Sequence, residues 1–212
     1  MTRLVVFDLD GTLVDSRRDL ANAANALVTE LGGSLLSEES VGNMVGEGAA
    51  VLVRRALTAA GLDPETPGAL PRFLELYDER LLDHTRPYDG IPEVLEQFHR
   101  RAVLGVLTNK PQAATDKLLE GLDLTRYFRV VVGGDTTLGR KPDPAGLAEI
   151  VRRSGAELWN TTLVGDSPVD LETGRRVGCD VVLVSYGFGY RDVELRDTER
   201  VVDHPSDLTT LL

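Results

Sequence analysis

The sequence contains only one cysteine, Cys179, among its 212 residues. A single thiol excludes an intramolecular disulfide bond and is typical of proteins from a reducing compartment, so we expect a cytoplasmic protein. Long apolar runs are also missing, because charged or polar residues interrupt each run after a few positions, first at Asp8. We therefore expect no membrane-spanning helix, no membrane partner and no secretory signal at the start of the sequence.

Positive charge is scarce. The formal net charge is −11, and lysine occurs only at Lys110, Lys117 and Lys141. An anionic protein repels polyanions, so we expect no nucleic acid partner. Most lysines in proteins are solvated surface residues, but three lysines among so many arginines make each of them worth considering as a functional residue.

Short runs rich in β-branched residues alternate with helical patterns along much of the chain. Five of these runs predict buried strands, at residues 3–7, 103–107, 130–132, 162–164 and 181–184. Strands that alternate with helices of this length predict βαβ crossovers and a parallel sheet with both faces covered. The sequence therefore predicts an α/β fold with a Rossmann-like parallel sheet as its core.

The first crossover is far longer than one helix requires. Three groups of apolar residues at helical spacing occur within it, the first formed by Leu20, Ala24, Leu27 and Leu31. We therefore expect a helical cap domain at residues 15–85, inserted after the first strand, and an α/β core domain made of residues 1–14 and 86–212.

Polar residues follow several predicted strands at the point where each strand ends. In open parallel sheets, ligands bind beyond the carboxyl ends of the strands, so these side chains are expected to converge. The convergent group consists of Asp8, Asp10, Thr12, Thr108, Asn109, Lys141, Asp166 and Asp170.

The acids in this group predict a cation site. Several carboxylates at one edge need a compensating cation, and oxygen ligands without histidine or cysteine favour a hard ion such as Mg²⁺ over zinc. Asp8 can coordinate the ion, whereas Asp10 can offer its backbone carbonyl and keep its side chain free for proton transfer.

Four segments of the chain, in order "DLDGTLVDS", "TNKP", "KPDP" and "GDSPVD", resemble the signature motifs of haloacid dehalogenase-superfamily phosphatases. The resemblance covers nearly the whole chain, including the cap inserted after the first motif. Two further segments, "GEGAAVLVRRAL" in the cap and "YGFGYRDVE" after the last predicted strand, are similar to phosphoglycolate phosphatases.

The resemblance implies a role for each residue of the convergent group. Asp8 would be the nucleophile that forms an aspartyl-phosphate, and Asp10 would be the general acid and base. Thr108 and the Asn109 backbone would hold phosphoryl oxygens, whose charge Lys141 would neutralise. Asp166 would complete the metal site, while Thr12 would support Asp10 and Asp170 would orient Lys141 or a metal-bound water.

In the cap, the functional interpretation is a substrate loop at Gly46, Glu47 and Gly48, together with an arginine that binds a second anionic group on the substrate; the resemblance favours Arg55 over Arg54 for this role. The alternative is a helix with a glycine-rich entry and an arginine in a surface ion pair.

These expectations favour a Mg²⁺-dependent phosphomonoesterase that acts on a small anionic phosphate ester such as 2-phosphoglycolate. A sugar-phosphate phosphatase or hexose-phosphate mutase of the same superfamily remains as an alternative. A phospho-receiver or binding module fits less well, because such modules carry the acceptor aspartate on a middle strand. We expect a monomer or a homodimer.

Overall fold

The structure is a computed structural model that describes residues 2–191, 193–197 and 199–211. Its core is a six-stranded sheet in which all neighbouring strands run parallel. The strands are β1 (Leu4–Phe7), β4 (Val103–Leu107), β5 (Val130–Val132), β6 (Thr161–Gly165), β7 (Asp180–Val184) and β8 (Glu199–Val202). The predicted α/β fold with a parallel sheet is confirmed.

The strand order is β5-β4-β1-β6-β7-β8. From β1 the chain therefore builds the sheet outward to one side through β4 and β5, and then to the other side from β6 onward. The point where the direction reverses lies between β1 and β6, and crevices at such points are where open α/β sheets bind ligands.

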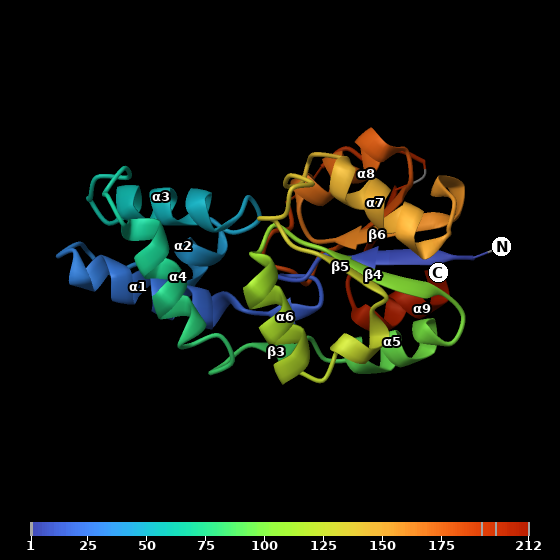
Figure 1. Cartoon of the computed structure of the whole chain (residues 1–212), viewed down its shortest axis with the longest axis horizontal. Helices are drawn as coiled ribbons and strands as arrows, with labels where there is room; N and C mark the ends of the chain where they lie inside the picture. The colour runs from blue at the N-terminus through green and yellow to red at the C-terminus, as the bar shows by residue number, and fades with distance from the viewer. Residues whose placement is uncertain (1, 192, 198, 212) are drawn as a thin grey trace.

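Helices cover both faces of the sheet (Figure 1). On one face lie α7 (Ala145–Ser154) and α8 (Pro168–Val177), and on the other lie α5 (Ile91–His99), α6 (Gln112–Gly121) and the short α9 (Leu208–Leu211). Alternate residues of β1 face the two layers: Leu4 and Val6 join the core around α7, whereas Val5 and Phe7 join the core around α5. Burial on both sides explains why β1 is apolar at every position.

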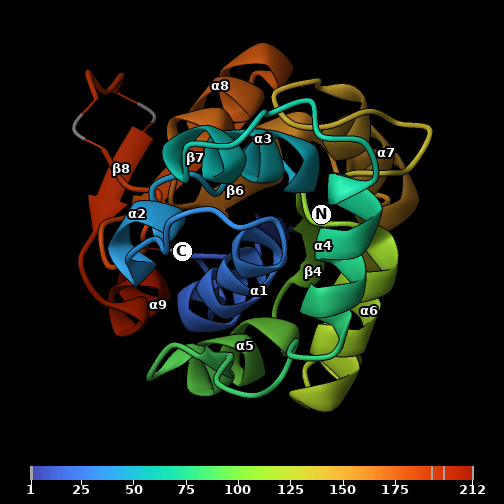
Figure 2. The ribbon, with the colours of Figure 1, turned by 90° about the vertical axis from the view of Figure 1, so that its left-hand side faces the viewer.

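Four helices form a separate group beyond the carboxyl ends of the strands (Figures 1 and 2). They are α1 (Arg17–Glu30), α2 (Glu38–Gly42), α3 (Ala49–Ala59) and α4 (Ala69–Asp78), and α1 packs against the other three. Their apolar faces are buried together, with Leu27, Leu57 and Phe73 each no more than 1% exposed. Leu31 was predicted to share this face, but it is 38% exposed, because it lies past the end of α1 as its C-cap residue.

The chain enters and leaves this helical group through a two-stranded antiparallel ribbon. Its strands are β2 (Val14–Asp15) and β3 (Arg86–Pro87). Gly90 then adopts a φ of +93° immediately before α5, and Pro92 lies in the first turn of that helix, where a proline costs no hydrogen bond.

The strand β8 was not predicted from the sequence. It lies at the edge of the sheet and contains charged residues, with Arg200 exposed, so it lacks the apolar run that marks the other strands. Across the residues that the structure describes, no helix combines the length and apolarity needed to cross a membrane.

Candidate active site

Loops at the carboxyl ends of β1, β4 and β6 bring most of the predicted residues together. Asp8 follows β1, Thr108 and Asn109 follow β4, and Asp166 follows β6. All four side chains are at least nine-tenths buried. Because β1 is hydrogen-bonded to both β4 and β6, the three loops lie side by side at one edge of the sheet.

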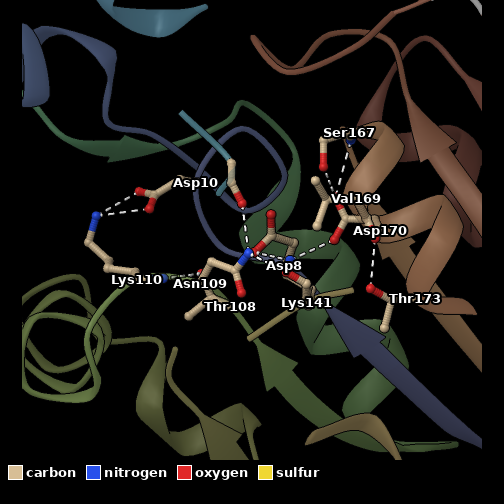
Figure 3. A network of polar contacts seen from close by, with 11 residues as sticks. Asp8, Asp10, Thr108, Asn109, Lys110, Lys141, Ser167, Val169, Asp170 and Thr173 are labelled. Atoms are coloured by element: carbon tan, nitrogen blue, oxygen red, sulfur yellow. Dashed lines mark hydrogen bonds and ion pairs between the residues drawn. The ribbon is translucent and has the colours of Figure 1, made fainter. Parts of the chain in front are cut away.

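Lys141 lies at the centre of this group (Figure 3). Its Nζ is 2.8 Å from Asp8 Oδ1 and donates a hydrogen bond of 2.6 Å to Asp170 Oδ1. The other oxygen of Asp170 accepts hydrogen bonds from the backbone N–H and the hydroxyl of Ser167, which forms the capping box of α8. Asp170 is thus held by its own helix end while it holds the lysine.

Asp166 is enclosed by glycine backbone. Its Oδ2 accepts a hydrogen bond of 2.6 Å from the Gly189 N–H. A Cβ atom on Gly11, which has a φ of +85°, would lie 1.9 Å from the same oxygen, and a Cβ on Gly187 would lie 2.4 Å from the Asp166 Cβ. These positions therefore require glycine, both for the close approach and, at Gly11, for the backbone conformation.

Burial and neighbouring acids disfavour the ionised forms of Asp8 and Asp166. Burial raises the pKa of Asp8 to about 6 despite the nearby Lys141 ammonium, and Asp170 adds to the rise. Burial, followed by Asp8 and Asp170, raises the pKa of Asp166 well above its usual range. Conversely, the carboxylates of Asp170 and Asp8 raise the pKa of Lys141 despite its burial. Three buried acids thus lie beside one ammonium, which pairs directly with only two of them, Asp8 and Asp170, among the described residues.

This donor set suits a hard divalent cation. Ligand oxygens from Asp8, Asp166 and Asp170 lie within 4.8 Å of one another, and all three residues are buried. Carboxylate oxygens without nitrogen or sulfur are typical Mg²⁺ ligands. An ion between Asp8 and Asp166 would supply the positive charge that Lys141 alone does not.

The Asp10 side chain points away from this cluster and toward Lys110 (Figure 3). Lys110 Nζ donates to both carboxylate oxygens of Asp10 at 2.9 Å, and the Ser16 hydroxyl donates to Oδ1 at 2.5 Å. Thr12 was predicted to support Asp10, but within the described chain its buried hydroxyl has no hydrogen-bond partner. Ser16 donates the hydrogen bond to Asp10 instead, since it lies at the start of α1 with its side chain facing Asp10.

Asn109 connects the sheet edge to the helical group. Its side-chain amide donates to the carbonyl oxygens of Gly46, at 2.8 Å, and Lys141, at 3.0 Å. Gly46 belongs to the loop before α3, in which a substrate loop was predicted. The contact places this loop directly above the sheet edge.

A cavity lies between the helical group and these loops. Its volume is about 510 Å³ with its open mouth included, and Asp8 and Asp10 line it from the sheet side. The residues on its other walls come from α1, α3, α4 and the loops before α3 and α6: Leu20, Val45, Gly46, Gly48, Ala49, Leu52, Phe73, Leu74, Tyr77, Thr108, Asn109, Lys110 and Pro111.

Two of the predicted cap residues do not line this cavity. Arg55 forms an ion pair with Glu47 and also donates to the Met44 carbonyl oxygen. Both side chains of the pair are more than two-fifths exposed. In this structure Arg55 therefore faces a different part of the surface from Asp8.

The place of Lys110 in the site was not predicted from the sequence. The residue is only 6% exposed, and it contacts Tyr77 of α4 as well as Asp10. The one signal in the sequence is the rarity of lysine. In the sequence, Tyr77 is recognisable only as one of the apolar residues at helical spacing. Its contact with Lys110 depends on how α4 lies over the sheet edge.

Comparison with protein families gives one clear match. Residues 5–184, which include every residue of the convergent group, match the family described as "Haloacid dehalogenase-like hydrolase". The matched range runs from β1 to the end of β7 and includes the four-helix group.

The chain is also similar to individual proteins over most of its length. It is 42% identical to the phosphoglycolate phosphatase of Rhodospirillum rubrum, across 91% of this chain and 83% of that protein. It is 35% identical to the phosphoglycolate phosphatase of Mesorhizobium japonicum, across 99% and 94%. Among solved structures, a predicted phosphoglycolate phosphatase from Haemophilus somnus superposes with a TM-score of 0.88 at 28% identity, covering 99% of this chain and 97% of that one.

Proposed function

Since the chain belongs to the haloacid dehalogenase-like hydrolase family and is a phosphoric monoester hydrolase, we propose that it is a Mg²⁺-dependent phosphatase of 2-phosphoglycolate. The observation that carries the chemistry is that Asp8, paired with the buried Lys141 behind it, lines the same cavity as Asp10. The names of the relatives support the substrate. The single cysteine supports a cytoplasmic location.

In the first proposed step, a carboxylate oxygen of Asp8 attacks the phosphorus atom. The bond between phosphorus and the ester oxygen breaks, and Asp10 donates its proton to that oxygen, so that glycolate leaves as a neutral alcohol group with its own carboxylate. Asp8 then carries the phosphoryl group as an aspartyl-phosphate. Lys141, the Thr108 hydroxyl and the Asn109 backbone N–H would stabilise the charge on the phosphoryl oxygens.

In the second step, water attacks the phosphorus atom of the aspartyl-phosphate. Asp10, now ionised, accepts a proton from this water. The bond between phosphorus and the Asp8 oxygen breaks, which releases inorganic phosphate and restores the Asp8 carboxylate. Ser16 and Lys110 hold the Asp10 carboxyl group for both proton transfers.

Asp8, Asp166 and the backbone carbonyl of Asp10 would hold the Mg²⁺ ion, and Asp170 would orient Lys141. When bound, the ion would neutralise charge on the phosphoryl group. A side chain at Gly11 or Gly187 would collide with Asp166, so these glycines leave the room that its carboxyl group needs.

We further propose that residues 15–85 act as a cap domain that closes over the core made of residues 1–14 and 86–212. The β2–β3 ribbon is the connection about which the helical group would move, and the contact of Asn109 with the Gly46 carbonyl belongs to the closed state. Closure would exclude bulk water and large substrates from Asp8.

The test is a panel of phosphorylated metabolites assayed with Mg²⁺, with kcat/KM measured for each. We expect 2-phosphoglycolate to rank first, EDTA to abolish turnover, and Asp8→Asn to lower kcat by roughly 10⁴-fold or more. The exposed Asp116→Asn, on α6, serves as the matched control. Normal turnover by Asp8→Asn would disprove the mechanism.

Other outcomes of the same panel identify the alternatives. A sugar phosphate ranking first indicates a sugar-phosphate phosphatase, and an isomeric sugar phosphate among the products indicates a hexose-phosphate mutase. Phosphorylation of the protein about once, without repeated release of phosphate, indicates a phospho-receiver module.

A further inference from the structure

Among the described residues that line the cavity above Asp8 and Asp10, one side chain is cationic. That side chain is Lys110, while the rest of the lining is apolar or uncharged apart from the two acids. Lys141 lies behind Asp8, where its ammonium group is already shared between Asp8 and Asp170. The ammonium of Lys110 is therefore the positive charge that a second anionic group of a substrate would meet inside the cavity.

Lys110 is held in place by residues from both halves of the molecule. Its Nζ donates to Asp10 Oδ1 and Oδ2, each at 2.9 Å, and to the Tyr77 hydroxyl oxygen at 2.6 Å. It also lies 4.6 Å from the centre of the Tyr77 ring. Asp10 belongs to the sheet edge and Tyr77 to α4, so the ammonium lies where the two walls of the cavity meet.

All three N–H groups of the lysine are used in this arrangement. Two of them point to the same carboxyl group, that of Asp10, so an anionic oxygen of a ligand can take one of these places while Asp10 keeps the other. The Tyr77 hydroxyl accepts from Lys110, so its own proton can be donated to another oxygen.

We propose that Lys110 and Tyr77 bind the carboxylate of the substrate and thereby select phosphate esters of short 2-hydroxy acids. The inference rests on the proposed function, since it assumes that the phosphoryl group lies at Asp8 and the ester oxygen at Asp10. In such an ester the carboxylate carbon is two bonds from the ester oxygen. A substrate carboxylate that close to Asp10 reaches the Lys110 ammonium, which Asp10 contacts. The ammonium then lies between the substrate carboxylate and the Asp10 carboxylate.

This assignment differs from the arginine expected from the sequence. Arg55 is paired with Glu47 and does not line the cavity, whereas Lys110 is buried in it. The two residues can be separated experimentally because they lie on different elements and share no partner.

The experiment compares two substrates that differ by the carboxylate, 2-phosphoglycolate and ethyl phosphate, for the wild type and Lys110→Met. The measured quantity is the ratio of their kcat/KM values, in which any general effect on Asp10 cancels. Loss of a hydrogen-bonded charge predicts that Lys110→Met lowers this ratio about 10- to 100-fold. Lys117→Met, which removes an exposed lysine paired with Asp78, should leave the ratio unchanged.

Binding supplies a second readout that does not involve turnover. In calorimetry with Mg²⁺ present, Lys110→Met should weaken phosphonoacetate by a similar factor and leave ethylphosphonate unaffected. Should Lys110→Met fail to fold, Tyr77→Phe replaces it, because it keeps the ring and removes the hydroxyl; we expect it to lower the ratio several-fold.

The outcomes are distinguishable. A ratio within twofold of the wild type in Lys110→Met and in Tyr77→Phe overturns the inference, and a loss of preference in Arg55→Met instead assigns the carboxylate to the arginine. A wild type without preference for 2-phosphoglycolate over ethyl phosphate contradicts the proposed substrate itself, and the assignment of Lys110 with it.

Discussion

The Ser16 hydroxyl donates a hydrogen bond of 2.5 Å to Asp10 Oδ1, although Ser16 occupies the N-cap position of α1. An N-cap serine usually accepts a hydrogen bond from a backbone N–H of the first helical turn. Ser16 makes no such side-chain bond, and it is fully buried. Its hydroxyl therefore orients the proposed general acid rather than the helix.

We predict that Ser16→Ala lowers kcat about tenfold, the usual value of a hydrogen bond to a charged group, with little change in KM. Lys110 still contacts both Asp10 oxygens in this variant, which limits the loss. Steady-state kinetics with 2-phosphoglycolate checks the prediction.

Thr12→Val provides the matched control, because the Thr12 hydroxyl is buried and makes no hydrogen bond within the described residues. Its kcat should stay within about twofold of the wild type, and its stability should be equal or higher, since an unpaired buried hydroxyl is removed. Equal kcat values for Ser16→Ala and the wild type would contradict the role given to Ser16.

A second prediction concerns the melting temperature of Asp166→Asn, which should be higher than that of the wild type without metal and lower with metal. Burial and the neighbouring acids raise the pKa of Asp166, so its charged form is unfavourable in the metal-free protein. The amide removes that charge and can still accept from the Gly189 N–H. In EDTA the variant should therefore unfold at a higher temperature than the wild type.

With Mg²⁺ the order should reverse, because an expected ligand is lost. We expect the dissociation constant for Mg²⁺ to rise about 100-fold, and the metal-induced rise in melting temperature to shrink accordingly. Thermal unfolding across a Mg²⁺ titration measures both effects. Asp180→Asn, at an exposed acid, should change neither. A lower melting temperature in EDTA together with an unchanged titration would argue against a metal site at Asp166.

The acid cluster was predictable from the sequence for a topological reason. Asp8, Asp166 and Lys141 follow different predicted strands, and parallel strands direct their carboxyl ends to one edge. The positions of these residues along the chain therefore indicated that they would meet, without any knowledge of side-chain packing.

The contacts of Asp10 were not predictable in the same way. Lys110 and Tyr77 meet because α4 lies over the loop after β4, and the tilt of one helix against a loop is set by packing that no local pattern encodes. The edge strand β8 was missed for a different reason. It is paired on one side only, so its sequence need not be apolar, and Glu199 at its start contributes an ion pair instead.

That ion pair predicts a pH dependence of stability. Glu199 is 4% exposed and accepts hydrogen bonds from Arg175 at 2.7 and 2.8 Å, which lower the pKa of its carboxyl group. The pKa of Glu199 is lower in the folded state than its ordinary value of 4.5. The unfolded state therefore binds more protons than the folded state once the pH falls toward 4.5. The stabilisation is present above that pH and is lost as the pH falls through the lowered pKa.

We expect Glu199→Gln to lower the free energy of unfolding by about 2 kcal/mol at pH 7 and by less near pH 3. Urea unfolding at a series of pH values measures this difference. Glu172→Gln, which breaks the exposed pair with Arg176 on α8, should cost less than about 0.5 kcal/mol throughout. A Glu199→Gln deficit that stays constant down to pH 3 would contradict the assignment.

A final prediction concerns the connection between the helical group and the core. Asp19 of α1 is fully buried, and its carboxylate accepts hydrogen bonds from the backbone N–H groups of His84 and Thr85 and from the Thr85 hydroxyl. These residues immediately precede β3, so the carboxylate fixes the chain where it leaves the helical group.

Asp19→Asn places an amide N–H₂ opposite donors that the carboxylate now satisfies. We expect it to lower the free energy of unfolding by about 3 kcal/mol, whereas Thr85→Val, which removes a single donor, should cost about 1 kcal/mol. Because Asp19 lies outside the cavity lining, the effect on kcat/KM should act through the placement of α1 and α4 over Asp8. Urea unfolding measures the loss of stability, limited proteolysis at residues 82–90 measures the opening of this connection, and steady-state kinetics measures kcat/KM. An Asp19→Asn variant as stable and as protease-resistant as Thr85→Val would show that the carboxylate does not hold this connection.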